Sequence, residues 1–288
     1  MLVIRRHGEL ELITQPAHAA VAGGLAQRWG SGSFSAVVAH ESLVCAALHH
    51  DDGWLEIDGQ PGYNASAARP AHFTEVRLAE SVGPYGRGVE SVYERDPLAG
   101  ALCSMHWSGF STSRWGTGGN HQSEDPLAQQ VIASQEARWM PALRAAWGNR
   151  GRRSQFDART WHAYEVLQAV DLLSLGLGLM DTDVRGNGSE PVAVAASLTS
   201  IDQEASARTI HGVPLTAGPE VVTLTLEPLG GGHVALDPYP LNGGAAYELT
   251  IPVRRILDQP YTSAEKAAAA YHDAEVQTRR VTLSPRAD

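Results

Sequence analysis

The chain has 288 residues, 43% of them hydrophobic, which is enough for a packed core and excludes a disordered chain. Its 22 Lys and Arg residues against 32 Asp and Glu residues give a formal net charge of −10, and because such a chain repels polyanions we expect no nucleic-acid partner. No segment approaches the run of about 18 apolar residues that a membrane span requires, so we expect no membrane partner and a cytoplasmic protein.

The first predicted elements are a hairpin and a helix. Residues 2–13 alternate around a His-Gly pair that suits a turn, which indicates two short strands. A helix is predicted over residues 14–29, because Thr14 can cap it and Pro16 is tolerated in its first turn.

A second helix is predicted over residues 35–50, where the sequence is apolar almost all round and therefore typical of a helix buried on most faces. It ends in the string HHDDGW, in which Gly53 is the expected stop. The following predicted elements are a loop over 56–73, a helix over 87–95, an apolar run that ends near His106, a flexible Gly-rich loop over 113–125, and helices over 126–147 and 157–180.

After Asp181 the content of Gly, Ser and Thr rises and strand-like patterns appear at 192–198, 221–227, 233–236 and 247–253, with one Ala-rich helix at 263–272. The predicted fold class is therefore α+β. We expect a mainly helical core over residues 1–181 that includes the N-terminal hairpin, and a β-rich region over 182–288 packed on it as one unit. The hairpin is expected to join the strands of that region.

The end of the second helix carries the first indication of chemistry. Four polar side chains in a row, His49 to Asp52, are costly at the edge of a core unless something pairs with them. A metal ion bound by His50 and Asp51 would pair with them. The cysteines, Cys45 and Cys103, lie in apolar runs without metal-site spacing, so we expect core thiols in a reducing compartment.

Three further residues are candidate metal ligands: His18, His106 and Asp171. Asp171 lies within the apolar stretch VLQAVDLLSLGLGL and is expected to be buried, where carboxylates pair with a charge or coordinate a metal. The alternatives are an ion pair for Asp171, a hydrogen bond to the backbone for His18, and a strand-end or loop position for His106.

The order of these residues resembles the HD-domain superfamily, whose helical core holds one or two metal ions. The string HDDG at 50–53 is similar to the HD-x-G form of many members. Many members have Lys after the Gly, near a substrate phosphate, whereas this chain has Trp54. The resemblance therefore does not extend to the Lys that would contact the phosphate in phosphate-ester hydrolysis.

Longer strings resemble DUF3891, an uncharacterised bacterial family of unknown function. They are QPAHAA, HHDDGW, HFTEV, AVDLLSL and the segment from ALDPYPL to IPVRRILDQPYTS. This resemblance spans nearly the whole chain and implies no established reaction.

The predicted function is that of a metal-dependent enzyme acting on a small molecule. Imidazole and carboxylate ligands suit divalent transition metals, of which iron or manganese is expected, as one or two ions. In the first interpretation the metal lowers the pKa of a water and the hydroxide attacks the substrate, with Asp51 able to bridge two ions. In the second, the same ligands hold a di-iron pair that activates dioxygen, and in the third the protein is a non-catalytic binding protein.

Several other residues receive predicted roles. His49 and Asp52 are expected to assist Asp51 in catalysis, and the residues expected to contact the substrate are Gln15, Trp54, Glu75 and His162, although a surface or loop position is an alternative for each. The expected partner is a small molecule, and a homodimer is left open.

Overall fold

The computed structural model describes residues 1–112, 124–147, 155, 157–186, 192–198, 207–243 and 246–287. Residues 113–123, which are most of the predicted Gly-rich loop, lie outside the described residues. Within them, no helix is both long and apolar enough to cross a membrane.

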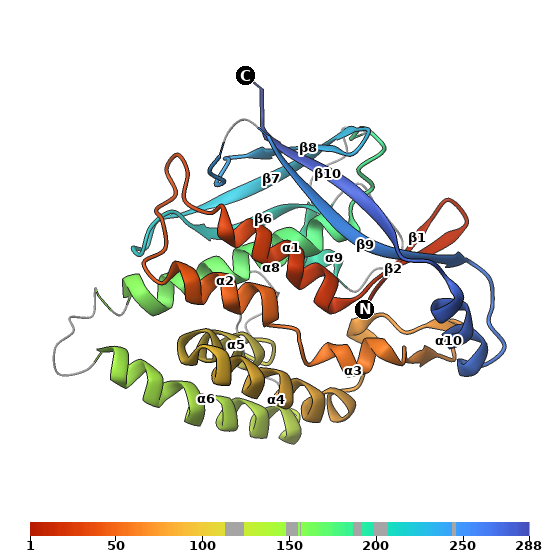
Figure 1. The fold of residues 1–288 in the computed structure, drawn as a ribbon, viewed down its shortest axis with the longest axis horizontal. Coiled ribbons are helices and arrows are strands. Elements are labelled where there is room, and N and C mark those ends of the chain that lie inside the picture. The colour runs from red at the N-terminus through yellow and green to blue at the C-terminus, as the bar shows by residue number, and fades with distance from the viewer. Residues whose placement is uncertain are drawn as a thin grey trace.

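One mixed sheet collects strands from both ends of the chain (Figure 1). Its strands are β1 (Leu2–Arg6), β2 (Glu9–Ile13), β5 (Val192–Ala193), β6 (Ala207–Pro214), β7 (Val221–Gly230), β8 (His233–Asp237), β9 (Tyr247–Leu257) and β10 (Gln277–Pro285). The strand order is β1-β2-β9-β10-β8-β7-β6-β5. The hairpin joins the sheet through β2, which pairs antiparallel with β9 so that Leu10 faces Ile256. The expected union of the hairpin with the C-terminal strands is confirmed.

The helices are α1 (Gln15–Gln27), α2 (His40–His49), α3 (Trp54–Gly59), α4 (Leu78–Arg95), α5 (Pro97–Gly109), α6 (Pro126–Trp147), α8 (His162–Leu179), α9 (Val194–Ser197) and α10 (Ala264–Asp273). A short pair of strands, β3 (Tyr63–Asn64) and β4 (Arg69–Pro70), a 3-10 turn (Phe73–Glu75) and a π turn (Asp157–Trp161) complete the described elements. In Figure 1 the sheet lies over α1 and α8, while α4, α5 and α6 form a layer on the far side of α2. The α+β class is confirmed.

Helix α8 runs through the centre of the molecule. Every residue in it except Glu165 is buried, as expected for a helix that is apolar all round. Its last carbonyl groups are satisfied by two arginines of the sheet: Arg279 donates to Leu177 O at 2.6 Å and Arg6 to Met180 O at 2.7 Å. Guanidinium groups at this end also oppose the negative end of the helix dipole. The sheet thereby fixes the helix that carries Asp171.

Helix α1 begins as predicted. The Thr14 side chain accepts a hydrogen bond from Ala17 N at 3.2 Å, and Pro16 lies in the first turn. Both features fix where the helix starts and therefore where His18 lies.

Several predicted boundaries are wrong. Helix α2 begins at residue 40 rather than 35. Helix α4 begins at 78 rather than 87, because Pro84 and two glycines in its first half give that segment the composition of a loop. The predicted loop over 56–73 contains most of α3, and the strand predicted over 192–198 is two strand residues followed by α9. Strands β6 and β10 were not predicted.

The run that ends near His106 is helix α5, not a strand end or loop. Asp96 caps it by accepting from Leu98 N at 2.8 Å, and Pro97 follows at the first helical position. Residues 99–109 are all buried, so the run has no amphipathic period from which a helix could be predicted. Cys103, on the same helix, is a core thiol whose pKa burial raises well above its usual value.

Candidate metal centre

Four helical segments bring the five predicted metal ligands together. His18 comes from the first turns of α1, His50 and Asp51 from the turn after α2, His106 from α5 and Asp171 from the middle of α8. Each of the five is at most 3% exposed. The cluster is therefore enclosed between the layers, where a polar group must find a partner.

The turn after α2 makes the convergence of His50 and Asp51 possible. The helix ends at His49, and Trp54 N donates to Asp51 O at 2.9 Å as α3 begins. The predicted stop at Gly53 is wrong, because α2 ends at His49 and Gly53, with a φ of −61°, directly precedes α3. Both side chains can face one point because they lie in a turn rather than on a regular helix.

Gly53 instead allows helix α4 to approach the turn closely. A Cβ at Gly53 would lie 2.4 Å from the Cα of Tyr85, and one at Gly88 would lie 2.4 Å from the Gly53 nitrogen. With no side chains between them, the turn and the helix touch backbone to backbone. Tyr85 can then donate its hydroxyl hydrogen to Asp51 Oδ1 at 2.9 Å.

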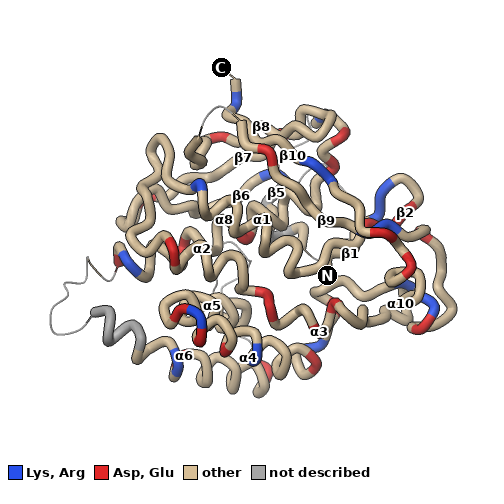
Figure 2. The backbone as a smooth tube through the Cα atoms, viewed as in Figure 1, with Lys and Arg blue, Asp and Glu red and all other residues tan. Residues whose placement is uncertain are grey.

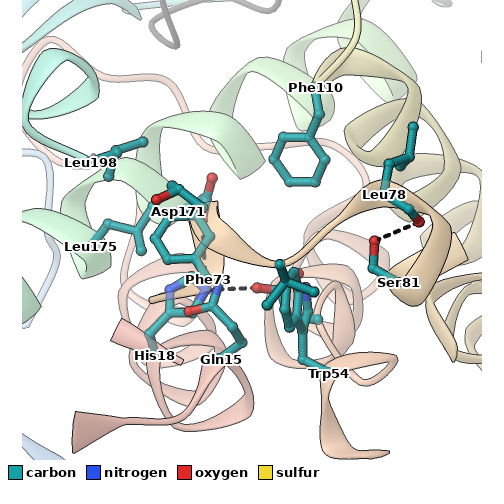
Figure 3. Close-up of a pocket in the computed structure, with 13 residues that line it drawn as sticks. Gln15, His18, Trp54, Phe73, Leu78, Ser81, Phe110, Asp171, Leu175 and Leu198 are labelled. Carbon is teal, nitrogen blue, oxygen red and sulfur yellow. Dashed lines mark hydrogen bonds and ion pairs between the residues drawn. The ribbon is translucent and has the colours of Figure 1, made fainter. Parts of the chain in front are cut away.

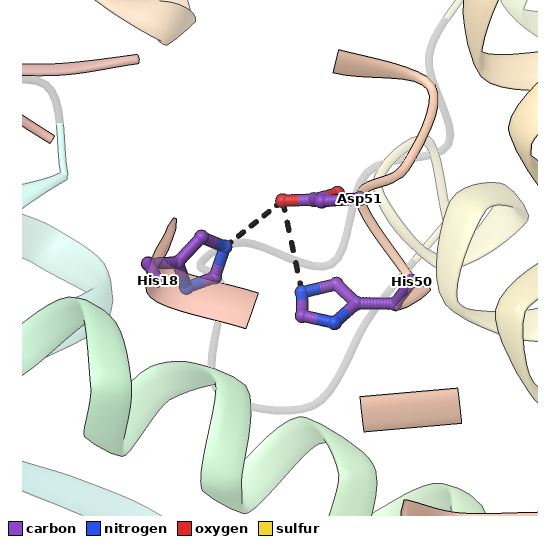
Figure 4. Close-up of side chains that lie close together, drawn as sticks. All are labelled: His18, His50 and Asp51. Carbon is purple, nitrogen blue, oxygen red and sulfur yellow. Dashed lines mark hydrogen bonds and ion pairs between the residues drawn. The ribbon is translucent and has the colours of Figure 1, made fainter. Parts of the chain in front are cut away.

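The imidazoles of His18 and His50 converge on the carboxylate of Asp51 (Figure 4). His18 Nε2 lies 2.9 Å from Asp51 Oδ2, and His50 Nε2 lies 3.6 Å from the same oxygen. On the other side, Asp171 Oδ1 lies 3.4 Å from His50 Nε2 and 3.9 Å from His18 Nε2. Two imidazoles and two carboxylates therefore surround one small volume.

Hydrogen bonds at the Nδ1 atoms of both rings determine their tautomers. In each neutral ring, the Nε2 atom that faces this volume carries no proton. The Ala47 carbonyl can only accept, so His50 Nδ1 donates to it at 2.9 Å. Ser174 donates its single hydroxyl hydrogen to Asp171 O at 2.8 Å, so its oxygen accepts from His18 Nδ1 at 2.7 Å. In the neutral rings both Nε2 atoms then direct lone pairs at carboxylate oxygens. Such contacts are favourable only with an additional proton or a cation between them.

The electrostatics of the cluster agree with this need for positive charge. Burial lowers the pKa of His50, but the neighbouring Asp51 and Asp171 outweigh it and raise that pKa to about 9. Burial raises the pKa of Asp51, whereas His50 and His18 outweigh it and hold that pKa well below its usual range. His50 Nε2 is buried and has no hydrogen-bond partner. Without a metal, the carboxylates keep a proton on His50.

Among the described residues, two groups of three side chains could hold a metal ion. The groups are His18, His50 and Asp51, and His50, His106 and Asp171. Within each group the ligand atoms lie within 4.8 Å of one another. His50 belongs to both groups.

A cavity of about 360 Å³ opens beside the cluster (Figure 3). Its polar wall includes His18, Asp51 and Asp171 of the cluster. The other lining residues are mainly apolar: Trp54, Phe73, Val76, Leu78, Phe110, Leu175 and Leu198, together with Gln15, Thr74 and Ser81. None of these lining residues is Lys or Arg. The cavity can therefore admit a small molecule to the cluster.

Of the residues predicted to contact a substrate, Gln15 and Trp54 line this cavity, and Glu75 and His162 are not among its lining residues. Glu75 binds Arg69 at 2.7 Å and caps its own turn by accepting from His72 N. His162 is buried at the start of α8, where burial lowers its pKa.

The two residues predicted to assist Asp51 lie on the outer side of the turn. His49 Nδ1 lies 3.0 Å from Asp52 Oδ2, and Arg95 reaches the same oxygen at 3.5 Å. Neither His49 nor Asp52 lines the cavity. Their catalytic roles remain predictions, as do the ligand roles of the five clustered residues.

Sequence reasoning missed Tyr85 and Ser174, which orient Asp51 and His18. Ser174 follows Asp171 by three residues on one helix, so its position on the same face was a usable signal. Nothing local to Tyr85 signals its role, because it depends on the contact between two glycines far apart in the sequence.

Comparison with known proteins identifies one family. The profile of DUF3891, described as a protein of unknown function, matches residues 1–258 of the 288. No curated protein and no solved structure matches the chain, and these comparisons show no relation to HD-domain proteins.

Proposed function

The chain belongs to the DUF3891 family, and we propose that it is a metal-dependent enzyme that hydrolyses a small molecule at the buried His/Asp cluster. One observation carries the proposal: the lone pairs of two oriented imidazoles face two buried carboxylates, and none of the described residues that line the cavity is Lys or Arg. Buried carboxylates are paired with a charge or coordinate a metal ion. The adjoining cavity supplies room for a substrate.

The shared position of His50 supports a single ion. Both candidate groups need a nitrogen of this residue, and its Nδ1 is committed to Ala47 O. The remaining Nε2 has one lone pair and can bind one ion. An ion bound by His50 would use His18 and Asp51 in one group, or His106 and Asp171 in the other. A donor set of N and O suits iron or manganese.

A divalent ion at this position would lower the pKa of a bound water toward neutrality. The residues of the chain contribute orientation. Ala47 and Ser174 hold the two imidazoles with Nε2 inward, and Tyr85 holds Asp51 through its Oδ1. Such hydrogen bonds behind metal ligands are worth about 10–100-fold in affinity or activity.

A second candidate, oxygen activation by a di-iron pair, is favoured by the apolar wall of the cavity, which suits a substrate to be oxidised. It requires two ions, whereas the single free nitrogen of His50 supports one. The third, a non-catalytic binding protein, would use the same cavity without turnover.

The test is an activity screen on protein loaded with iron or manganese, using aryl esters and anilides as hydrolytic probes and an oxygen electrode for the alternative. We expect metal-dependent hydrolysis that Asp171→Asn abolishes and His211→Gln retains. His211 is a suitable control because it is exposed, forms a hydrogen bond with Thr223 and does not line the cavity. Oxygen consumption without hydrolysis would favour the oxygenase, and metal binding with neither activity would favour a binding protein.

A further inference from the structure

The polar atoms of the cavity wall outside the metal cluster are mainly acceptors, beginning with Thr74. The Thr74 backbone N–H donates to His72 Nδ1 at 3.3 Å, so that nitrogen carries no proton. Burial lowers the pKa of His72 to about 3, which keeps the ring neutral. The Thr74 hydroxyl can then donate its hydrogen to the same nitrogen, 3.0 Å away. In that arrangement its oxygen offers lone pairs to a ligand.

Ser81 and Gln15 extend this pattern. The Ser81 hydroxyl donates to Leu78 O at 3.2 Å, so its oxygen can also only accept (Figure 3). Gln15 is 4% exposed, and its side-chain oxygen has no hydrogen-bond partner. Because a terminal amide can be turned over, Gln15 can present its oxygen to a ligand. A ligand that donates hydrogen bonds would satisfy all three residues.

The charge of the cavity excludes an anion. Asp51 and Asp171 would together balance one divalent ion, so the loaded site has no excess positive charge, and none of the described residues that line the wall is Lys or Arg. Trp54 and Phe73 meet nearly edge to face, at 87° with centroids 6.4 Å apart. Faces of aromatic rings attract cations rather than anions.

Resting on the function proposed above, we propose that the cavity selects an apolar amine or amide, whose N–H groups donate to the acceptors of Thr74, Ser81 and Gln15. The apolar body of such a molecule would lie against Trp54 and Phe73. A volume of about 360 Å³ is within the range of small-molecule sites. Carboxylates and phosphate esters should bind weakly, because they carry hydrogen-bond acceptors and negative charge. The cavity wall already contains acceptors and the carboxylates of Asp51 and Asp171.

The test is calorimetric titration of metal-loaded protein with three probes of similar shape: phenylacetamide, N,N-dimethylphenylacetamide and phenylacetate. We expect phenylacetamide to bind about tenfold or more tightly than either of the others, because each of the others lacks the amide N–H groups that would donate to the acceptors of the cavity wall. A Thr74→Val and Ser81→Ala double variant should reduce the difference in affinity between phenylacetamide and N,N-dimethylphenylacetamide. If the dimethyl probe binds weakly only because of its size, that difference should remain in the double variant. His211→Gln should leave all three affinities unchanged.

Equal or tighter binding of phenylacetate, or no binding of any probe, would overturn the inference. Metal content measured on the same samples separates the two proposals. Metal binding without a preference for the amide would refute the substrate class and leave the metal site intact. A preference for the amide in protein that binds no metal would refute the metal-dependent function and retain the selectivity of the wall.

Discussion

Two regions of this molecule bury charge, and they differ in how that charge is balanced. At the end of the sheet formed by β1, β2 and β9, acidic and basic residues meet (Figure 2). Glu11, 1% exposed, binds Arg279 through Oε1 and Arg255 through Oε2, each at 2.8 Å. Burial lowers the pKa of Arg279 to about 10, so it stays charged at neutral pH. Side chains of the protein complete this network.

The carboxylates of the His/Asp cluster face the Nε2 atoms of two imidazoles whose Nδ1 atoms are bonded to Ala47 and Ser174. These carboxylates are balanced by an additional proton on His50 when no metal is bound, or by a cation. Burial of a charge alone therefore does not indicate a binding site. The Glu11 carboxylate is balanced by guanidinium groups that are always charged, whereas the carboxylates of the cluster face imidazoles, which balance them only when protonated or bound to a cation.

The largest effect on the free energy of unfolding is expected in the ion-pair network around Glu11. Glu11→Gln should leave Arg279 buried beside a neutral group and lower the free energy of unfolding by about 3–5 kcal/mol. Urea denaturation measures this, with Glu227→Gln as the control, since that carboxylate pairs with Arg286 at the surface and should cost less than about 1 kcal/mol. Metal content of the folded Glu11 variant should be unchanged. A loss of metal without a loss of stability would reverse the roles assigned to the two regions.

The second-largest effect on stability is expected where helix α4 positions the turn that carries Asp51. Gly88→Ala should cost about 1–3 kcal/mol and separate Tyr85 from Asp51, because its Cβ would collide with the Gly53 backbone. Gly86→Ala on the same helix is the matched control: its nearest atom, on Trp107, is 3.7 Å away. That variant should be neutral or more stable by up to about 1 kcal/mol. Equal effects of both changes, measured by thermal unfolding, would contradict the close-approach explanation.

A smaller effect on stability is expected at Asp171. Asp171→Asn should change the free energy of unfolding of metal-free protein by less than about 1 kcal/mol, because Asp51 remains to balance a protonated His50. The same variant should lose metal binding. A drop of about 3–5 kcal/mol in metal-free protein would instead assign Asp171 to a structural ion pair, like Glu11.

The pH dependence provides a further test of the cluster. The folded-state pKa of His50, about 9, lies above its unfolded value of 6.5, so its contribution to stability is complete below the unfolded pKa and is lost as pH rises through about 9. Metal-free protein should therefore lose stability over this interval. Because a metal needs the neutral ring, binding at about pH 7.5 should release about one proton. Calorimetry in buffers of different ionisation enthalpy measures that proton, and binding with no release would contradict a ligand role for His50.

Much of the arrangement follows from local sequence, and the rest does not. Thr14 and Pro16 identify the start of α1, and the apolar neighbours of Asp171 indicate its burial. Helix α5 was missed because it is buried on all sides and has no polar face. The contact that orients Tyr85 joins Gly53 to Gly88, and no local pattern specifies such a pairing.

The balance of charge in the cluster could be anticipated only in part. A row of His and Asp residues after an apolar helix indicates unsatisfied polar atoms, but the direction of each imidazole depends on Ala47 and Ser174 in three dimensions. Conversely, Glu11 gave no signal in an alternating strand, although it forms the centre of a buried network.

The proposed function requires that the buried His/Asp cluster holds a metal ion. Elemental analysis of freshly purified wild-type protein, beside His50→Ala and the surface control His211→Ala, tests it most directly. We predict about one equivalent of a transition metal in the wild type and in the surface variant, and nearly none in His50→Ala. Wild-type protein that contains no metal and takes up none when titrated with iron or manganese would contradict the claim.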